Sequence, residues 1–521
     1  MGKGSRIRRE HELEAQNAPV QKKRNPKIGK IIGRVIVVIL CLAIVGGASW
    51  GIAYTTGAVH RGFAAIKVGD QKVSALEFGM YYHDTLSNVL YYYGQYGLTA
   101  ANIETQMYDE ETTWGDFIRD SVVTQLTEAY VLYNEALAAG YDYSADAYAQ
   151  AQYAAYHKQF ETSAAEQEME LDEFVKAVYG SQMKLADFEK MLERRFTYVG
   201  YQHQLKAGLT AGDDEIEAYY SENKDNYDKV SYRYFTIPYE KVTYTAPAEG
   251  EKLAEGAPAS EDEASAITEE NRKAAEEKAN EMQSRITDEQ SFIELAREYA
   301  SDEDREKYEK DDATLVTTGS AASTSPLAEW YKSADRRAGD TDVIDNNNNG
   351  YTVAYYLSRE RDSSSTVDVR HILLGTETAA EDASDEEKAA VESANAEQKE
   401  LAEKVLSQWE SGEKTEESFA ALAKEYSEDG NAAEGGLYEN VTRGQMVAEF
   451  NDWIFDSARR TGDSGIVQTS YGYHVMYFVG DGMPAWKASA RTDLLAQKYQ
   501  ELYDSLAEKY KVSTSEFAMK L

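Results

Sequence analysis

The stretch VDVRHILL at residues 367–374 and the stretch YGYHVMYFV at residues 471–479 decide the fold of the most informative part of this 521-residue chain. Each is a short run of alternating apolar residues, a pattern that predicts a β-strand. Each strand carries one histidine, His371 in the first and His474 in the second. If the two strands share a small sheet, both imidazoles can meet across it.

Two further motifs lie between these strands, within residues 366–479: FAALAKEYSEDGNAAEGG at 419–436 and RGQMVAEFNDWIFDSARRTGDSGIVQT at 443–469. Together with the two strands, and in this order, they resemble the parvulin family of peptidyl-prolyl isomerases. The resemblance covers roughly 110 of the 521 residues. It implies an α+β domain, with an antiparallel sheet and surrounding helices, that interconverts the cis and trans forms of X-Pro peptide bonds.

The reaction defines what such a site needs. Rotation about an X-Pro bond has a barrier of about 20 kcal/mol and takes tens of seconds uncatalysed. No covalent bond has to break, so the site must bind the twisted imide better than the planar one and needs no nucleophile. By resemblance, the catalytic residues are His371, Asp429, His474 and Thr469, and the substrate-binding residues are Met446, Phe450 and Tyr438.

The resemblance also implies a role for each catalytic residue. His371 and His474 would be paired imidazoles, and Thr469 would hold one of the rings. Asp429 would lie near the substrate carbonyl, where a carboxylate disfavours the planar amide, whose oxygen carries partial negative charge. A single histidine in an apolar strand is more often a core residue. We favour the functional interpretation because the pair occurs with the other motif residues in family order.

The proline pocket shows both agreement with the family and departures from it. Met446 and Phe450 match its apolar floor, although their spacing alone is typical of ordinary helix core, and Tyr438 matches the rim. Val441 stands where an aromatic residue is common, which predicts a looser pocket. Glu439 replaces a glycine that usually follows the rim residue, which predicts an altered turn.

The residues before this domain repeat part of its pattern. SYRYFTI at 231–237 parallels VRHILL, and EWYKSADRRAGDTDVIDNNNNGYTVAYYL at 329–357 parallels DWIFDSARRTGDSGIVQTSYGYHVMYFV at 452–479. In this first copy Tyr234 stands at the position of His371, and Thr352 stands at the position of His474. We therefore predict a degenerate, non-catalytic parvulin-like domain.

The N-terminal region predicts a membrane anchor. Residues 35–54, VIVVILCLAIVGGASWGIAY, carry no charge, and a helix of this length spans a hydrocarbon core of about 30 Å. Residues 1–34 hold ten Lys or Arg against three Glu, which predicts a cytoplasmic N-terminus and an extracytoplasmic remainder. A cleaved signal peptide is the alternative, but the apolar core of such peptides is usually shorter. The only cysteine, Cys41, lies in this run, so no intramolecular disulfide can form.

The composition indicates which classes of ligand the protein is expected to bind. The formal net charge of −38 would repel nucleic acid and favours basic or neutral clients. The remaining histidines have no zinc-ligand spacing, and a calcium site is disfavoured because no spaced acidic loop is present. We expect no cofactor and no metal site.

Outside the parvulin-like segments, the chain is predicted to be mainly helical. A strand pair with a GD turn and an aromatic-rich helix open this part, and the run EIEAYYSENKDNYDKVSYRYF at 215–235 resembles the exit from the N-terminal domain of PrsA- and SurA-type foldases. We favour plain helix packing over client contact for the tyrosine clusters at 81–83 and 91–97. The predicted order is a basic segment (1–34), a transmembrane helix (35–54), a helical chaperone domain (62–228), a degenerate parvulin-like domain (229–360), an isomerase domain (361–482) and a C-terminal helix on the chaperone domain (483–521).

The expected function is that of a membrane-anchored folding factor outside the cytoplasm, in a bacterium with a single membrane. It would bind unfolded or partly folded exported proteins and isomerise their X-Pro bonds. A second copy of the chain is a candidate partner in a homodimer. One alternative is a non-catalytic holdase that uses both parvulin domains only for interaction. Another is an assembly factor for one dedicated membrane or wall enzyme, which the sequence does not separate from a general foldase.

Overall fold

A computed structural model of the protein describes residues 53–246, 256–318, 325–346, 350–380 and 383–521. These form two compact units, and one of them is discontinuous in sequence. The first combines the chain up to residue 202 with residues 505–521, and the second is residues 203–504. The predicted membrane span lies outside the described residues except for its last two positions. Among the described residues, no helix has the length and apolar character needed to cross a membrane.

A small antiparallel sheet and a set of helices make up the first unit. Its strand order is β11-β1-β2, with β1 (Ala64–Val68) and β2 (Gln71–Ser74) joined by the predicted GD turn. The outer strand β11 (Val512–Thr514) was not predicted, because a three-residue strand is too short to show alternation. The helices are α3 (Ala58–Gly62), α4 (Ala75–Tyr93), α5 (Trp114–Ala138), α6 (Ala147–Glu166), α7 (Leu171–Tyr179), α8 (Leu185–Ala207) and α18 (Glu516–Met519).

The tyrosine clusters of the first unit differ from each other. Tyr81 is buried in the α4 core, as predicted for helix packing. The second cluster is more exposed: Tyr91 and Tyr92 at the end of α4 and Tyr96 in the following 3-10 helix point largely into solvent, whereas Tyr93 contacts the Trp114 ring. The prediction of plain helix packing was therefore wrong for Tyr91, Tyr92 and Tyr96. The packed face of α4 carries Val89, Leu90 and Tyr93 at this end, and Tyr91 and Tyr92 lie outside it.

Two four-stranded antiparallel sheets organise the second unit, which agrees with the predicted mixed α and β class. The first has the order β4-β3-β6-β5, and the second has the order β8-β7-β10-β9. The first is built from β3 (Asp228–Ile237), β4 (Leu315–Thr318), β5 (Thr341–Asp345) and β6 (Tyr351–Arg361). The second is built from β7 (Ser365–Gly375), β8 (Leu437–Val441), β9 (Ser464–Thr469) and β10 (Gly472–Pro484).

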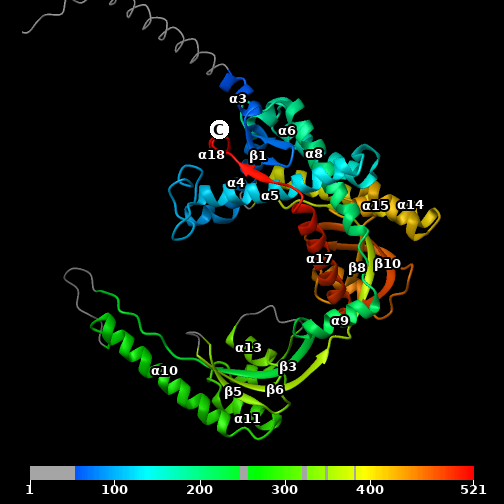
Figure 1. Cartoon of the computed structure of the whole chain (residues 1–521). Coiled ribbons are helices and arrows are strands. Elements are labelled where there is room, and N and C mark those ends of the chain that lie inside the picture. Colours follow the sequence, from blue (N-terminus) through cyan, green and yellow to red (C-terminus); the bar gives the residue numbers. More distant parts are fainter. Residues whose placement is uncertain (1–52, 247–255, 319–324, 347–349, 381–382) are drawn as a thin grey trace, which may run out of the picture. The chain divides into compact units, whose positions relative to one another are not determined.

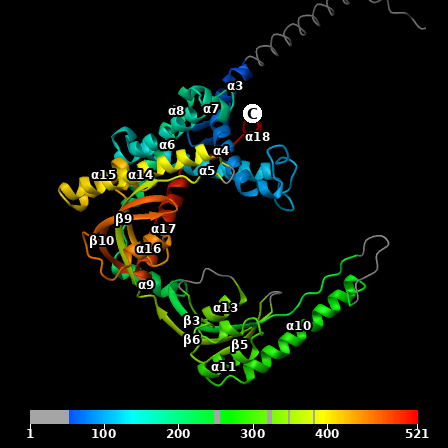
Figure 2. The same ribbon diagram turned by 180° about the vertical axis from the view of Figure 1, so that it is seen from behind.

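Each face of the second sheet packs on different helices (Figure 2). The long α14 (Asp385–Ser411) and α15 (Glu416–Tyr426) cover one face around Ile372, Val475 and Phe419. The short α16 (Ala448–Ile454) covers the other face, with Phe450 among buried valines and Met476. Because side chains alternate along a strand, the residues next to Ile372 and Val475 in sequence face α16. His371 and His474 are therefore on the α16 side.

The first sheet has corresponding elements in the same order (Figure 1). Helices α10 (Glu261–Ser284) and α11 (Glu289–Tyr299) pack on the face that carries Phe235 and Val353. Helix α13 (Pro326–Lys332) packs on the opposite face. The short α12 (Arg305–Tyr308) precedes β4.

Helix α17 (Ala485–Ala507) continues directly from β10. Its Ala490 and Leu494 pack with Ile216 of α9 (Asp213–Asn223) and with Tyr227. Four short 3-10 helices complete the described secondary structure: η1 (Gly94–Tyr96), η2 (Tyr143–Ala145), η3 (Lys224–Asn226) and η4 (Ala432–Glu434).

Candidate active site

The register of β7 and β10 brings the two histidines together. His371 pairs with Met476, and His474 pairs with Leu373, so the histidines are diagonal neighbours on one face of the sheet. Their rings stack with centroids 5.3 Å apart and an interplanar angle of 24°. Both are almost fully buried, at 1% and 5% exposure. Burial of two imidazoles without compensating contacts would be costly, so their hydrogen bonds decide what the pair can do.

A hydrogen-bond chain runs through the pair. His371 Nδ1 and His474 Nδ1 are 3.1 Å apart, and His474 Nε2 is 2.9 Å from the Thr469 hydroxyl. Thr469 Oγ1 also accepts the backbone N–H of Tyr471 at 3.1 Å. Both nitrogens of His474 are thus engaged, which fixes the orientation of its ring.

The far nitrogen of His371 faces Asp429. His371 Nε2 is buried and has no hydrogen-bond partner, while Asp429 Oδ2 lies 3.6 Å from it. The other oxygen, Asp429 Oδ1, accepts the backbone N–H of Asn431 at 3.0 Å and the Tyr438 hydroxyl at 3.1 Å. The Asp429 side chain is about one-fifth exposed, so one edge of the carboxylate can reach a ligand while the other is held.

The charges of the site follow from these contacts. Interaction with His371, together with the Asn431 N–H and the Tyr438 hydroxyl, lowers the pKa of Asp429 to about 2 against the effect of burial. Burial, and then the neighbouring His371, lower the pKa of His474 to about 4. At neutral pH the site therefore contains an ionised Asp429 and a neutral His474.

These protonation states favour one direction for the hydrogen bonds. An ionised Asp429 favours a proton on His371 Nε2, which faces it. With the His371 proton on Nε2 and His474 neutral, the Thr469 hydroxyl donates to His474 Nε2, and His474 Nδ1–H donates to His371 Nδ1. His371 then presents its Nε2–H toward Asp429. In this hydrogen-bond chain from Thr469 to His371, only His371 Nε2, which faces Asp429, has no hydrogen-bond partner.

Aromatic and apolar side chains enclose the histidines. Tyr438 stacks on His371 with centroids 5.2 Å apart, and Phe450 meets both imidazoles edge to face at 5.4 Å. Met446 is half-buried against the same cluster. Burial and the charge of Asp429 raise the pKa of Tyr438 to about 12, so its hydroxyl stays protonated and donates to Asp429. The structure therefore brings together all seven residues predicted from the sequence.

The segment that carries Asp429 is tied to strand β7 by contacts that were not predicted. Ser427 Oγ accepts the N–H of both Leu373 and Asp429. His371 N–H donates to the carbonyl of Gly436 at 2.9 Å. Gly436 has φ +68°, and a Cβ there would lie 2.0 Å from the His371 carbonyl oxygen. Only glycine fits this approach, and the GG pair in the sequence was the available signal.

Arg370 is a further residue that the sequence reasoning missed. Its Nε donates to Glu416 at 2.8 Å, and its Nη1 donates to the carbonyl of Gly435 at 2.9 Å. The corresponding Arg233 of the first sheet makes the same contact with Glu289, also at 2.8 Å. The shared arginine in VRHILL and SYRYFTI was the signal for this repeated contact.

The two departures from the family pattern do not obstruct the site. Val441 is buried in β8 opposite Val367, within the cluster that contains Phe450. Glu439 is exposed, and the unusual backbone is at the next residue, Asn440, whose φ is +54°. Asn440 tolerates this conformation because its N–H donates to Asp368, while its own Oδ1 accepts the Met483 N–H.

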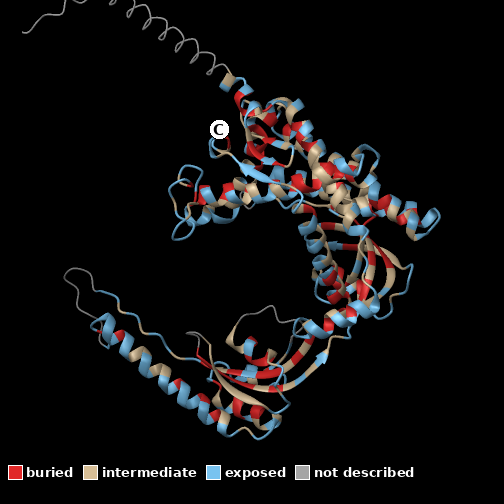
Figure 3. Ribbon diagram, viewed as in Figure 1, coloured by how far each residue is buried: buried red, intermediate tan, exposed pale blue. Residues whose placement is uncertain are grey.

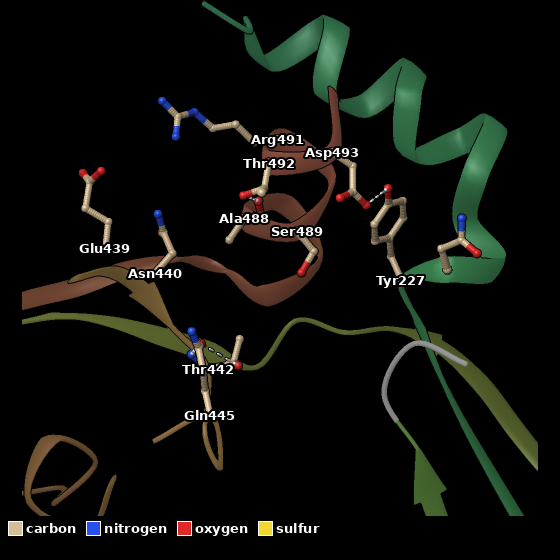
Figure 4. Close-up of a pocket in the computed structure, with 11 residues that line it drawn as sticks. Tyr227, Glu439, Asn440, Thr442, Gln445, Ala488, Ser489, Arg491, Thr492 and Asp493 are labelled. Carbon is tan, nitrogen blue, oxygen red and sulfur yellow. Dashed lines mark hydrogen bonds between the residues drawn. The ribbon is translucent and has the colours of Figure 1, made fainter. Parts of the chain in front are cut away.

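A separate cavity of about 620 Å³ lies between the β8 side of this domain and α17 (Figure 4). Glu439 and Asn440 line one side, and Arg491 and Asp493 line the other. None of the seven predicted site residues lines it. Its lining is polar with mixed charge, and it contains neither of the two buried histidines nor Asp429, so we place the candidate active site at the histidine pair. No cluster of metal-ligating side chains occurs among the described residues.

Comparison with known proteins identifies the class of this domain. Residues 353–480 match the family model of the PPIC-type PPIase domain, so the region of β7 to β10 is a parvulin-type peptidyl-prolyl isomerase domain. The match begins within β6 and contains all seven site residues.

The chain is similar to PrsA-type foldases. It is 39% identical over 67 residues to foldase protein PrsA 1 of Listeria innocua, which covers 13% of this chain and 23% of that relative. The match thus spans about a quarter of the relative's length. Among solved structures, PrsA of Bacillus subtilis is 25% identical, with 28% of this chain and 48% of that chain covered and a TM-score of 0.18. A SurA-like chaperone of Campylobacter jejuni is 22% identical, with 28% and 52% covered and a TM-score of 0.17. At these TM-scores the two structural matches carry no argument.

Proposed function

We propose that this protein is a membrane-anchored folding factor outside the cytoplasm. It binds unfolded or partly folded exported proteins and isomerises their X-Pro bonds at the site of His371, His474 and Asp429. The peptidyl-prolyl isomerase domain and the similarity to PrsA-type foldases support the general class. Client binding, anchoring and location are the parts that we add.

One observation carries the catalytic part of this proposal. The buried histidine pair ends at an ionised carboxylate beside Tyr438 and the apolar side chains of Met446 and Phe450. An X-Pro imide whose ring lies on these apolar groups would place its carbonyl near Asp429. The carboxylate would raise the free energy of the planar amide, whose oxygen carries partial negative charge. It would raise that of the twisted form less, so the barrier to rotation would fall. The site offers no nucleophile, and the reaction needs none.

The first sheet supports a division of labour. It keeps the strand order and the arginine contact of the isomerase domain, but Tyr234 and Thr352 occupy the histidine positions. Thr352 Oγ1 is 3.0 Å from the Thr236 hydroxyl, and Tyr234 is exposed. We therefore assign residues 229–360 a role in client binding or spacing, as a degenerate copy without catalysis.

Residues 35–54 would anchor the protein, with residues 1–34 in the cytoplasm and the two described units on the other side of the membrane. Tethering raises the local concentration of a foldase where exported chains emerge. This location suits a bacterium with a single membrane. Association into a homodimer remains a prediction, which analytical ultracentrifugation of the full-length chain can test.

The decisive experiment measures cis/trans isomerisation of X-Pro peptides by the full-length chain and by Asp429→Ala. Asp302 occupies the corresponding position of the first copy and is exposed, so Asp302→Ala is the matched control. We expect Asp429→Ala to lower kcat/KM by about tenfold or more and Asp302→Ala to leave it unchanged. If the folded wild type shows no acceleration but suppresses aggregation of an unfolded client, the protein is a holdase instead.

A further inference from the structure

One end of the α4 and α5 helix pair exposes an unusual number of aromatic rings. The side chains of Tyr91, Tyr92 and Tyr96 are 82%, 65% and 74% exposed, within six residues of one another. Met107 and Tyr108, in the loop that leads to α5, are also exposed. Figure 3 shows this end of the helices largely in the colour of exposed residues. We call residues 91–113 the tyrosine tip.

The tip has an ordered base. Leu98, Ile103 and Trp114 are buried beneath it. Tyr93 lies 4.8 Å from the Trp114 ring, and Tyr108 stacks at 4.1 Å on Phe117. Arg119, buried at the start of α5, donates to both oxygens of Glu104 and so fastens the loop to the helix. The outer rings therefore stand on a held platform, which lowers the entropy lost when a partner binds.

The charge of the tip has one sign. Residues 91–118 contain five carboxylates and no Lys or Arg. The next cation along the chain, Arg119, is paired with Glu104 and Asp116, and the charge of Lys520 also acts on Asp116, at the base of the tip. Glu110 and Glu111 are exposed in the turn between Tyr108 and Thr112. The backbone N–H groups of Glu111 and Thr112 lower the pKa of Asp109, which keeps this third carboxylate ionised.

We infer that the tyrosine tip binds extended polypeptide segments that carry Lys or Arg among apolar residues. Tyrosine gives a large contact area at a small cost in side-chain entropy, and its ring face attracts ammonium and guanidinium groups. The neighbouring carboxylates add attraction for the same cations. This inference rests on the proposed function, since it names the chemical class of client that the folding factor would prefer.

A membrane surface is the competing occupant, because tyrosine is also common at the membrane interface. The charge of the tip argues against it. Anionic lipid headgroups attract Lys and Arg, and the tip has neither among residues 91–118 while it presents exposed carboxylates. The positively charged polypeptide is therefore the occupant that the observations favour.

The test uses the full-length chain and two fluorescent peptides without proline, which share the same Leu and Ser residues and differ only in Lys or Glu at the charged positions. Fluorescence anisotropy gives the Kd of each. We expect the wild type to prefer the Lys peptide, with an affinity that falls as salt is raised. The variant Tyr91→Ser/Tyr92→Ser/Tyr96→Ser should weaken Lys-peptide binding by about tenfold.

A charge reversal tests the contribution of the carboxylates separately from that of the tyrosine rings. Glu110→Lys/Glu111→Lys should weaken Lys-peptide binding by about fivefold and strengthen Glu-peptide binding. The matched control is Glu270→Lys/Glu277→Lys on α10, which changes the net charge equally at two exposed positions. It should alter either Kd by less than about twofold. All three sets of positions are exposed, so circular dichroism should show an unchanged fold.

Equal affinity for both peptides, or unchanged binding by the tyrosine variant, would overturn the inference. Binding of the wild type, but not the tyrosine variant, to phosphatidylcholine vesicles with no effect on peptide binding would assign the tip to a membrane surface instead. Isomerisation of a short X-Pro peptide should be the same for all these variants. A wild type that binds the Lys peptide but isomerises nothing would refute the proposed catalysis and leave this inference standing.

Discussion

His371 and His474 share a hydrogen bond between their Nδ1 atoms, 3.1 Å apart, yet their outer nitrogens face different partners. His474 Nε2 contacts the buried hydroxyl of Thr469, whereas His371 Nε2 faces the ionised Asp429. One end of the pair is closed by the protein and the other opens toward the carboxylate.

The closed end can be tested by removing the hydroxyl. Thr469→Val leaves both His474 Nε2 and the Tyr471 N–H unpaired, so we expect a loss of stability of about 1–3 kcal/mol and a lower kcat/KM. Thr469→Ser should restore both. Chemical denaturation and the isomerase assay measure the two effects. In the first sheet, Thr352 stands at the position of His474, and Thr352→Val removes a buried hydroxyl there, so it should lower stability alone.

The dependence on pH follows from the directions of the two pKa shifts. His474 has a folded pKa of about 4, below its ordinary 6.5, so its contribution to stability is complete above about pH 6.5 and is lost as the pH falls toward 4. His474→Asn should remove this part of the acid sensitivity. The variant and the wild type would then differ less in denaturation midpoint at pH 4 than at pH 7. An equal difference at both values would contradict a neutral buried His474.

The proposed active form, with Asp429 ionised and His474 neutral, should be present over a wide range of pH. Asp429, with a folded pKa of about 2, loses its stabilising contribution only between about pH 4 and pH 2. An ionised Asp429 and a neutral His474 therefore coexist from about pH 5 upward. We expect kcat/KM to change by less than about twofold between pH 5 and pH 8, measured by NMR exchange of an X-Pro peptide. A fall centred near pH 6 would show that another group controls the reaction.

Much of this site could be predicted from the sequence because its residues occur in short ordered motifs. The alternation in VDVRHILL and YGYHVMYFV gave the two strands, and family order gave Asp429 and Thr469. The contacts that hold the loop could not be predicted, because Ser427 and Arg370 bond to backbone atoms distant in sequence. The exposure of Tyr91, Tyr92 and Tyr96 could not be predicted either, because the run YYYGQYG has the composition of a core and does not show which of its rings pack on Trp114.

The close approach of the loop to β7 gives a prediction about glycine. Gly436→Ala would place a Cβ 2.0 Å from the His371 carbonyl oxygen at a positive φ, so the loop must move. We expect a loss of stability of about 2–4 kcal/mol together with a loss of isomerase activity. Gly430→Ala is the control, because a Cβ there meets nothing within 4 Å. Equal effects of the two substitutions would mean that the approach of Gly436 is not required.

The arginine that both sheets share allows a matched test of their roles. Arg370 joins Glu416 to the carbonyl of Gly435, and Arg233 joins Glu289 to the carbonyl of Asp311. Each guanidinium is largely buried, so replacement by Gln should cost each sheet about 1–3 kcal/mol of stability.

Only the substitution in the second sheet should change catalysis. Arg370→Gln frees the loop between Asp429 and Gly436, so kcat/KM should fall by about tenfold, while Arg233→Gln should leave it unchanged. The two substitutions are a matched pair, because each removes a guanidinium from the corresponding strand of its sheet, β7 for Arg370 and β3 for Arg233. A comparable loss of activity in Arg233→Gln would show that the first sheet takes part in isomerisation, and its description as a degenerate copy would then be wrong.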